Sequence, residues 1–278
     1  DTLDMGRSVV GPYLWDRGIR RLDHVVGTHP QLDHVGGLAW LVRAFEVGRY
    51  WSNGVERSEP FYQRLSQALR DRGLTESVAA EGQAIVDSGG CRLLVLNPPH
   101  AIDLSVEGVV EPAGSRGGLR GAGFNNRSVV TRLDCGSHSF LFAADVEVEA
   151  LARLREGKAS VAAQVLKVPH HGARSSLDRP WINQVGAEVA VISVGRRNPY
   201  GHPVPEVLAA YEESGARVYR TDRQGAVWVT ARVSSGAMQI RSAVEGLPQP
   251  VRVGASLSEA MAVEGRNLER LGRQWSGL

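Results

Sequence analysis

The chain has 278 residues, of which 42% are hydrophobic and 22% are charged, and its formal net charge is +2. This length suits one large layered domain or two small ones, and the composition is typical of a soluble globular protein. The small net charge excludes any inference of a polyanion partner from charge alone. Lys158 and Lys167 are the only lysines, so the basic residues are nearly all arginine. Arginine binds phosphate well, although a codon bias explains this excess more simply.

No apolar stretch reaches the ~18 residues that a membrane-spanning helix needs, and no signal peptide is visible. The chain has no initiator methionine and opens inside what reads as a motif. We therefore expect it to be part of a longer protein.

Two cysteines, Cys91 and Cys135, each lie in an apolar run that is typical of a strand. Cysteine in such a setting usually behaves as a small buried hydrophobic residue. We therefore expect buried free thiols rather than a disulfide or a cysteine metal site.

Predicted strands and helices alternate along the chain. The first half is expected to contain, in order, a helix at 9–17, a strand at 22–26, helices at 38–45 and 60–72, and strands at 84–86 and 91–96. The second half is expected to contain strands at 128–133 and 139–143, a helix at 148–155, strands at 165–168 and 189–194, a helix at 205–214, and strands at 217–219 and 226–230. This alternation predicts an α/β layered fold. We divide the chain into a domain at 1–245 and a C-terminal helical tail at 246–278.

Potential metal ligands stand just beyond the ends of four predicted strands. Loops at such positions assemble functional sites in layered α/β folds, and histidine and aspartate are ligand types for Zn²⁺ or Mn²⁺. In chain order, these residues are His29, Asp33, His34, Asp145, His170, His171 and His202.

The tightest signal is the run from His29 through Asp33-His34 to Gly36-Gly37. A proline follows His29 and a strand precedes it, so a loop that wraps its side chains around one point fits better than a helix face. The two glycines let the next helix begin close to that point. The alternative is a surface loop with incidental histidines.

The other strand ends leave choices open. Asp145 is either the N-cap of the following helix or a metal ligand, and the nearby histidines favour the ligand. One residue of the His170-His171 pair binds metal or donates a proton while the other packs, and spacing does not assign the roles. His202, in a loop bracketed by proline and glycine, is a ligand or a turn residue.

These motifs resemble those of the metallo-β-lactamase superfamily and, within it, the C-terminal domain of ComEC-like competence proteins. The superfamily motif His-x-His-x-Asp-His is matched by His29, Asp33 and His34. The ComEC-like group is similar over residues 1–232, including the segments 12–23, 125–130, 165–172, 193–203 and 220–225.

The resemblance implies an αββα four-layered sandwich whose N-terminal strands are missing from this fragment because they would precede Asp1. It implies one or two divalent metal ions, Mn²⁺, Zn²⁺ or Mg²⁺, at one edge of the two sheets. The ligands that the motif match implies are His29, Gln31, Asp33, His34, Asp145 and His202.

Two departures bear on the metal site. Gln31 stands where the superfamily has histidine, and its neutral amide oxygen would loosen one metal site or favour Mn²⁺ or Mg²⁺ over Zn²⁺. The third-motif histidine has no counterpart, and Asn125 or Asn126 stands near that place.

The implied function is metal-dependent phosphodiester hydrolysis by the nuclease domain of a DNA-uptake protein, which would degrade the non-imported strand during natural transformation. Asp33, His170 and His171 are the expected catalytic residues. The expected substrate-binding residues are Asn125, Asn126, Ser128, Arg174, Arg196 and Arg197.

The expected partners are DNA, taken to be single-stranded, and the rest of a membrane channel protein in the parent chain. The domain is expected on the extracytoplasmic side of the inner membrane. Two alternatives remain: a degenerate module that only guides DNA, which Gln31 and the missing histidine favour, and a small-molecule hydrolase on the same fold.

Overall fold

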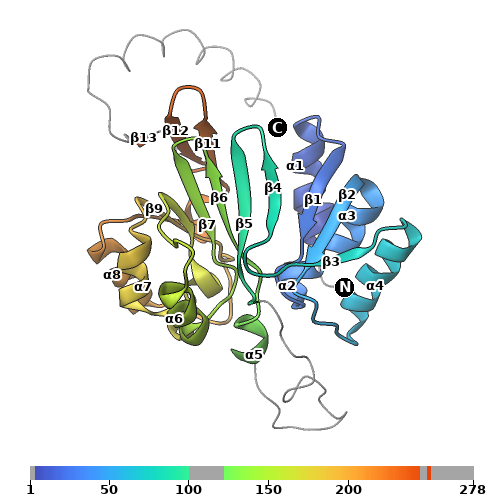
Figure 1. Cartoon of the computed structure of the whole chain (residues 1–278), viewed down its shortest axis with the longest axis horizontal. Coiled ribbons are helices and arrows are strands. Elements are labelled where there is room, and N and C mark those ends of the chain that lie inside the picture. The colour runs from blue at the N-terminus through green and yellow to red at the C-terminus, as the bar shows by residue number, and fades with distance from the viewer. Residues whose placement is uncertain (1–3, 100–121, 245–248, 252–278) are drawn as a thin grey trace.

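The computed structural model describes residues 4–99, 122–244 and 249–251 (Figure 1). The elements of the first half, in chain order, are η1 (Gly6–Val10), α1 (Gly11–Asp16), β1 (Arg21–Val26), α2 (Leu32–Val35), α3 (Leu38–Ala44), β2 (Glu46–Ser52), α4 (Pro60–Asp71), β3 (Glu76–Val78), β4 (Ala84–Ser88) and β5 (Cys91–Asn97).

The second half continues the alternation of helices and strands. Its elements are α5 (Ala122–Asn125), β6 (Val130–Cys135), β7 (His138–Phe142), α6 (Val148–Glu156), β8 (Val165–Lys167), η2 (Pro169–Gly172), η3 (Arg174–Ser176), α7 (Arg179–Val185), β9 (Val189–Ile192), α8 (Pro205–Glu213), β10 (Arg217–Arg220), α9 (Thr221–Gln224), β11 (Val227–Arg232), β12 (Ala237–Ser242) and β13 (Gln249–Val251).

The strands form one large sheet and two small ones. The large sheet has the order β10-β9-β8-β7-β6-β5-β4. Strands β7 to β10 in it are parallel, whereas β4 to β7 are antiparallel. One small sheet is the parallel β1-β2-β3 and the other is the antiparallel β11-β12-β13.

Helices cover the two outer faces of these sheets, as Figure 1 shows, with α3 and α4 on one side and α6, α7 and α8 on the other. Trp181 of α7 and Tyr211 of α8 pack with Leu166 and Ile192 of the large sheet in one buried core. A second core joins α3 and α4 to the outer face of β1 and β2, and contains Tyr50 and Leu65.

The inner faces of the sheets pack on each other. Trp51 of β2 packs with Ile85 and Val95 of the large sheet. Further along, Tyr219 of the large sheet packs with Ile240 of β12. Strands β8 and β9 therefore lie between helices and a second sheet, which explains their nearly continuous apolar sequences. The predicted αββα sandwich is confirmed.

The ends of the helices follow from local sequence. In α7, the side chain of Asp178 accepts a hydrogen bond from the backbone N–H of Trp181, and Gly186 ends the helix in the left-handed conformation. Helix α4 begins at Pro60, where the missing N–H costs nothing. Within the described residues, no helix has the length and apolar character to cross a membrane.

The two cysteines correct one expectation. Cys91 and Cys135 are directly opposite each other on the antiparallel pair β5 and β6, their Cα atoms are 4.1 Å apart, and they form a disulfide. The expectation of free thiols was wrong because an apolar run around each cysteine does not reveal that the two strands pair in this register.

The predicted C-terminal tail is described in small part. Residues 249–251 form β13 and pair with β12. The rest of the helical tail expected at 246–278 lies outside the described residues.

Candidate metal centre

Four segments meet at one edge of the sheets. Strands β7, β8 and β9 are parallel, so the segments that follow them leave at the same edge. The segment after β1, which includes α2, reaches this edge from the small sheet. These four segments carry His29, Asp33, His34, Asp145, His170, His171 and His202.

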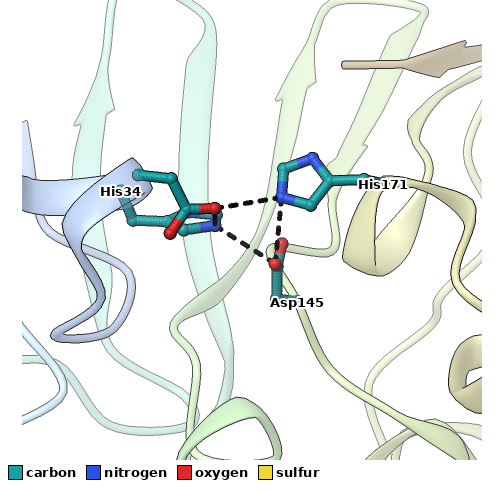
Figure 2. Close-up of side chains that lie close together, drawn as sticks. His34, Asp145 and His171 are labelled. Atoms are coloured by element: carbon teal, nitrogen blue, oxygen red, sulfur yellow. Dashed lines mark hydrogen bonds and ion pairs between the residues drawn. The ribbon is translucent and has the colours of Figure 1, made fainter. Parts of the chain in front are cut away.

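Four of these side chains form a compact group. The Nε2 atom of His34 lies 3.1 Å from Oδ2 of Asp145 and 3.5 Å from Oδ2 of Asp33. The Nε2 atom of His171 lies at the same two distances from the same two oxygens. The four donor atoms all lie within 4.8 Å of one another. Figure 2 shows His34, Asp145 and His171 converging from three different segments.

The orientation of His171 fits a metal ligand. Its Nδ1 atom lies 2.6 Å from the carbonyl oxygen of Ser193, which can only accept, so Nδ1 donates its proton there. Its Nε2 atom is buried and makes no hydrogen bond within the described residues, although Asp145 is 3.1 Å away. A backbone carbonyl that holds Nδ1 in this way is the usual support for a histidine that binds metal through Nε2.

The spacing and chemistry of the group also fit a divalent ion. Ligand atoms about 2.0–2.1 Å from a tetrahedral ion lie roughly 3.3–3.4 Å from one another. The four contacts here are 3.1–3.5 Å. Two imidazole nitrogens and two carboxylate oxygens are ligand types that Zn²⁺ and Mn²⁺ accept.

The charges at the site favour ionised carboxylates. Burial raises the pKa of Asp145, but His171, His34 and Lys167 outweigh it and hold that pKa well below its usual range. Contact with His171 likewise lowers the pKa of Asp33. Burial lowers the pKa of His171, yet Asp145 and Asp33 outweigh it and raise that pKa to about 9. The site is therefore prepared to hold positive charge.

The backbone around the group is strained. Within the described residues, the non-glycine residues with positive φ are Ala144, His170 and His171, with φ of 47°, 46° and 54°. All three adjoin or belong to the group, and the backbone N–H of His170 donates to the carbonyl of Ala144 at 3.0 Å. Gly172 follows, and a Cβ there would lie 2.5 Å from Cβ of Pro203. Strain of this kind is concentrated at functional sites.

Three residues predicted as ligands lie beside the group and outside it. His29 is almost fully buried, its ring centroid lies 4.0 Å from that of His34, and its Nε2 has no hydrogen-bond partner within the described residues. Burial and the neighbouring His34 lower the pKa of His29 to about 4. His202 lies beside His170, with ring centroids 5.9 Å apart. The side-chain amide of Gln31 donates to Oδ1 of Asn125 at 3.0 Å.

A second polar cluster adjoins the group. Oε1 of Glu147 accepts hydrogen bonds from Asn125 and Ser175, and it lies 3.1 Å from Nδ1 of His170. The structure thus separates the two adjacent histidines: His171 joins the carboxylates, and His170 joins Glu147.

The predicted substrate-binding residues occupy different environments. Asn126 accepts a hydrogen bond from the backbone N–H of Glu147, and Ser128 is fully buried, so both support the local fold. Arg174 is exposed and pairs with Glu206. Arg196 and Arg197 are exposed on the loop after β9.

Three residues that sequence reasoning missed belong to this region: Glu147, Ser175 and Lys167. Lys167 donates to the carbonyl of Ala144 at 2.8 Å and lies 3.3 Å from Oδ1 of Asp145. A signal for Glu147 existed, because it is a charged residue two positions after Asp145 in an otherwise apolar stretch.

Comparisons with known proteins agree with this arrangement. Residues 2–196 match the family model described as "Metallo-beta-lactamase superfamily". The chain is 29% identical over 223 residues to ComE operon protein 3 of Bacillus subtilis (strain 168). This alignment covers 80% of this chain and 26% of that protein. It is 26% identical over 229 residues to competence protein ComA of Neisseria gonorrhoeae, and this second alignment covers 81% of this chain and 28% of that protein.

The chain thus spans about a quarter of the length of these two relatives. Among solved structures, it is similar to CmlA, a diiron β-hydroxylase from Streptomyces venezuelae, with 16% identity and a TM-score of 0.42 over 72% of this chain and 44% of that one. That similarity is too low to support a functional inference. The family model covers most of the chain, and the chain belongs to the metallo-β-lactamase superfamily.

Proposed function

We propose that the chain is a metal-dependent phosphodiesterase that hydrolyses DNA within a longer DNA-uptake protein. The observation that carries this proposal is the group of Asp33, His34, Asp145 and His171 at the shared edge of the sheets. The superfamily consists mostly of metal-dependent hydrolases, and one of the matched relatives is named a competence protein, which supports DNA as the substrate.

One divalent ion, Zn²⁺, Mn²⁺ or Mg²⁺, would be held by Nε2 of His34 and His171 and by the carboxylates of Asp33 and Asp145. Among the described residues, Nε2 of His29 and Nδ1 of His202 are also buried without hydrogen-bond partners, one beside His34 and the other beside His170, and each would be available to a second ion. Gln31 donates from Nε2 to Asn125, and its Oε1, the atom that would contact an ion, stays a proposed ligand.

When bound, a divalent ion supplies Lewis acidity toward a phosphate oxygen and makes water a stronger nucleophile. Asp33 has the more exposed carboxylate of the pair, since 61% of its side chain is accessible against 2% for Asp145. Asp33 is therefore the carboxylate that reaches an attacking water and accepts its proton. His170 is the described histidine of the site that this proposal assigns to no ion; it is partly exposed, and it donates a proton to the leaving oxygen.

The substrate groups are proposed from charge and position. Arg196 and Arg197 lie on the same exposed loop as His202, and Arg174 follows the His170-His171 pair. These guanidinium groups would bind the phosphates of a single strand, which makes binding salt-dependent.

The parent context is also a proposal. The domain would act on the extracytoplasmic side of the inner membrane, beside the channel that the rest of the protein forms, and would degrade the non-imported strand. The Cys91–Cys135 disulfide supports this side, because disulfides persist in oxidising compartments.

The test is cleavage of end-labelled single-stranded DNA by the purified chain in Mn²⁺, Mg²⁺, Zn²⁺ or EDTA, with metal content measured in parallel. Asp145→Asn and the double variant Asp33→Ala, His34→Ala are expected to cleave no faster than the EDTA control. Asp23→Asn is the matched control, since Asp23 is exposed on β1, and it should cleave like the wild type.

The two alternatives give different outcomes. A small-molecule hydrolase would bind metal and lack salt-dependent binding of DNA. A DNA-guiding module would bind DNA and lack stoichiometric metal. Either outcome would overturn the nuclease proposal.

A further inference from the structure

Glu147 is a buried acidic residue without an evident structural need for its charge. It is 7% exposed and stands at the N-cap of α6, yet its side chain makes no capping hydrogen bond to that helix. Within the described residues its only ion-pair partner is His170. Burying a carboxylate is costly unless it is well supplied with hydrogen bonds.

The hydrogen bonds that Glu147 does receive come from loops that carry the site. Oε1 accepts from Nδ2 of Asn125 at 3.1 Å and from Oγ of Ser175 at 3.0 Å. The same oxygen lies 3.1 Å from Nδ1 of His170. Asn125 is in turn bound by the amide of Gln31, from the segment that precedes Asp33 and His34. One oxygen thus ties three segments together around His170.

These contacts determine which nitrogen of His170 carries the proton. Nδ1 has two neighbours, Oε1 of Glu147 at 3.1 Å and Oγ of Ser175 at 3.2 Å. The carboxylate can only accept. Ser175 gives its single proton to Glu147, so toward His170 its oxygen can also only accept. An Nδ1 without a proton would face two acceptor oxygens, whereas Nδ1–H donates to Oγ of Ser175 and faces the negative charge of Glu147.

We propose that Glu147 is a positioning residue that fixes His170 as its Nδ1–H tautomer and orients its ring, so that Nε2 is the nitrogen offered to the substrate. The backbone assists, because His170 has φ of 46° and its N–H is held by the carbonyl of Ala144. A carboxylate that holds Nδ1 sets which ring nitrogen is free. In the hydrolysis proposed above, on which this role rests, Nε2 takes up a proton from solvent to give the imidazolium and then passes that proton to the leaving oxygen.

The adjacent histidine shows the same device with a different acceptor. His171 donates from Nδ1 to the carbonyl of Ser193, which leaves its Nε2 for the carboxylates. Nδ1 is thus the nitrogen that faces an acceptor in both rings, the carbonyl of Ser193 for His171 and the carboxylate of Glu147 for His170.

The test reads the tautomer directly, without metal or substrate. Long-range ¹H–¹⁵N spectra of the metal-free chain with ¹⁵N-labelled histidine distinguish a protonated ring nitrogen from an unprotonated one. The His170 signals are assigned by their loss in His170→Gln. We expect the wild type to show His170 as Nδ1–H. Glu147→Met removes the acceptor oxygen and leaves the proton of Ser175 free for Nδ1, so it should show the Nε2–H form or an average of the two.

Two further variants separate positioning from a merely structural role. Glu149→Met is the matched control in the same turn of α6, where Glu149 is exposed, and it should leave the tautomer unchanged. Ser175→Ala should keep Nδ1–H, because the carboxylate still accepts. If Glu147→Met does not fold, the wild-type and Ser175→Ala spectra still decide the question.

An Nε2–H or averaged His170 in the wild type would overturn the proposal, as would a folded Glu147→Met that keeps Nδ1–H. Because the tautomer is measured without metal or DNA, this result stands apart from the nuclease test. If the chain does cleave DNA, Glu147→Met should lower kcat with KM little changed, whereas loss of metal binding would raise the metal requirement instead.

Discussion

The ammonium group of Lys167 lies 3.3 Å from Oδ1 of Asp145, the oxygen that the two histidines leave free. Lys167 also donates to the carbonyl of Ala144, so it holds both the carboxylate and the strained residue before it. Lys167 therefore holds Asp145 through Oδ1, while Oδ2 of the same carboxylate faces the metal group.

Replacing Lys167 with methionine should destabilise the metal-free protein by about 1–3 kcal/mol, because a buried carboxylate loses a charged partner. A bound divalent ion supplies positive charge to the same carboxylate, so the loss should be smaller in saturating metal. Urea unfolding with EDTA and with metal measures both values. Lys158→Met, at an exposed lysine, is the control and should change neither; an equal loss for Lys167→Met in both conditions would contradict this account.

Metal affinity should rise with pH. Burial lowers the pKa of His171, but Asp145 and Asp33 raise it to about 9 in the metal-free protein. The ring is therefore protonated at neutral pH, and an ion must displace that proton to reach Nε2. The apparent Kd should fall roughly tenfold per pH unit from pH 7 toward pH 9 and then level off as far as this group is concerned.

Calorimetry in two buffers of different ionisation enthalpy measures the released proton. At pH 7 the wild type and His24→Gln should release at least one proton per ion, and His171→Gln should release about one fewer. Binding without proton release would show that the ion does not bind through His171.

Much of the fold could be predicted from sequence because its signals are local. The apolar runs of β8 and β9 and the start of α4 at Pro60 identify their elements directly. Strand β2 was missed because Gly48 and Arg49 interrupt its pattern, and its residues become buried only toward Trp51. The helix predicted at 9–17 is instead a π-helical turn followed by a short α-helix.

The site was predictable in its members more than in their roles. Histidine and aspartate residues at the ends of predicted strands implied that Asp33, His34 and Asp145 would meet. The choice between His170 and His171 depends on two consecutive left-handed residues, which point adjacent rings to different partners. No spacing in the sequence encodes that turn, nor the contact of Glu147 with loops far along the chain.

The left-handed backbone of Ala144 gives a further prediction. An alanine with φ of 47° costs roughly 1–2 kcal/mol in strain. Glycine removes that strain while losing a buried methyl group worth about 0.8 kcal/mol and some conformational entropy. Ala144→Gly should therefore change the free energy of unfolding by less than about 1 kcal/mol.

Ala143 offers the matched control, since it is fully buried and has no positive φ. Ala143→Gly relieves no backbone strain, so it should lower the free energy of unfolding by about 1–2 kcal/mol. Urea unfolding of both variants in EDTA compares them. Equal losses at the two positions would mean that the backbone of Ala144 stores no strain.

The disulfide between Cys91 and Cys135 should contribute to stability through the unfolded chain. It links positions 44 residues apart, and closing a loop of this length corresponds to about 4 kcal/mol in the chain-entropy model. Reduction should therefore lower Tm, whereas a Cys91→Ala, Cys135→Ala double variant should start lower and ignore the reductant. Thermal unfolding with and without dithiothreitol measures this change in Tm. A wild-type Tm that does not change on complete reduction would show that the disulfide adds no stability and that packing alone stabilises β5 and β6. Val95 of β5 belongs to the inner core that joins the large sheet to β2. Loss of the disulfide should therefore also weaken the packing of the large sheet, whose other strands carry part of the site.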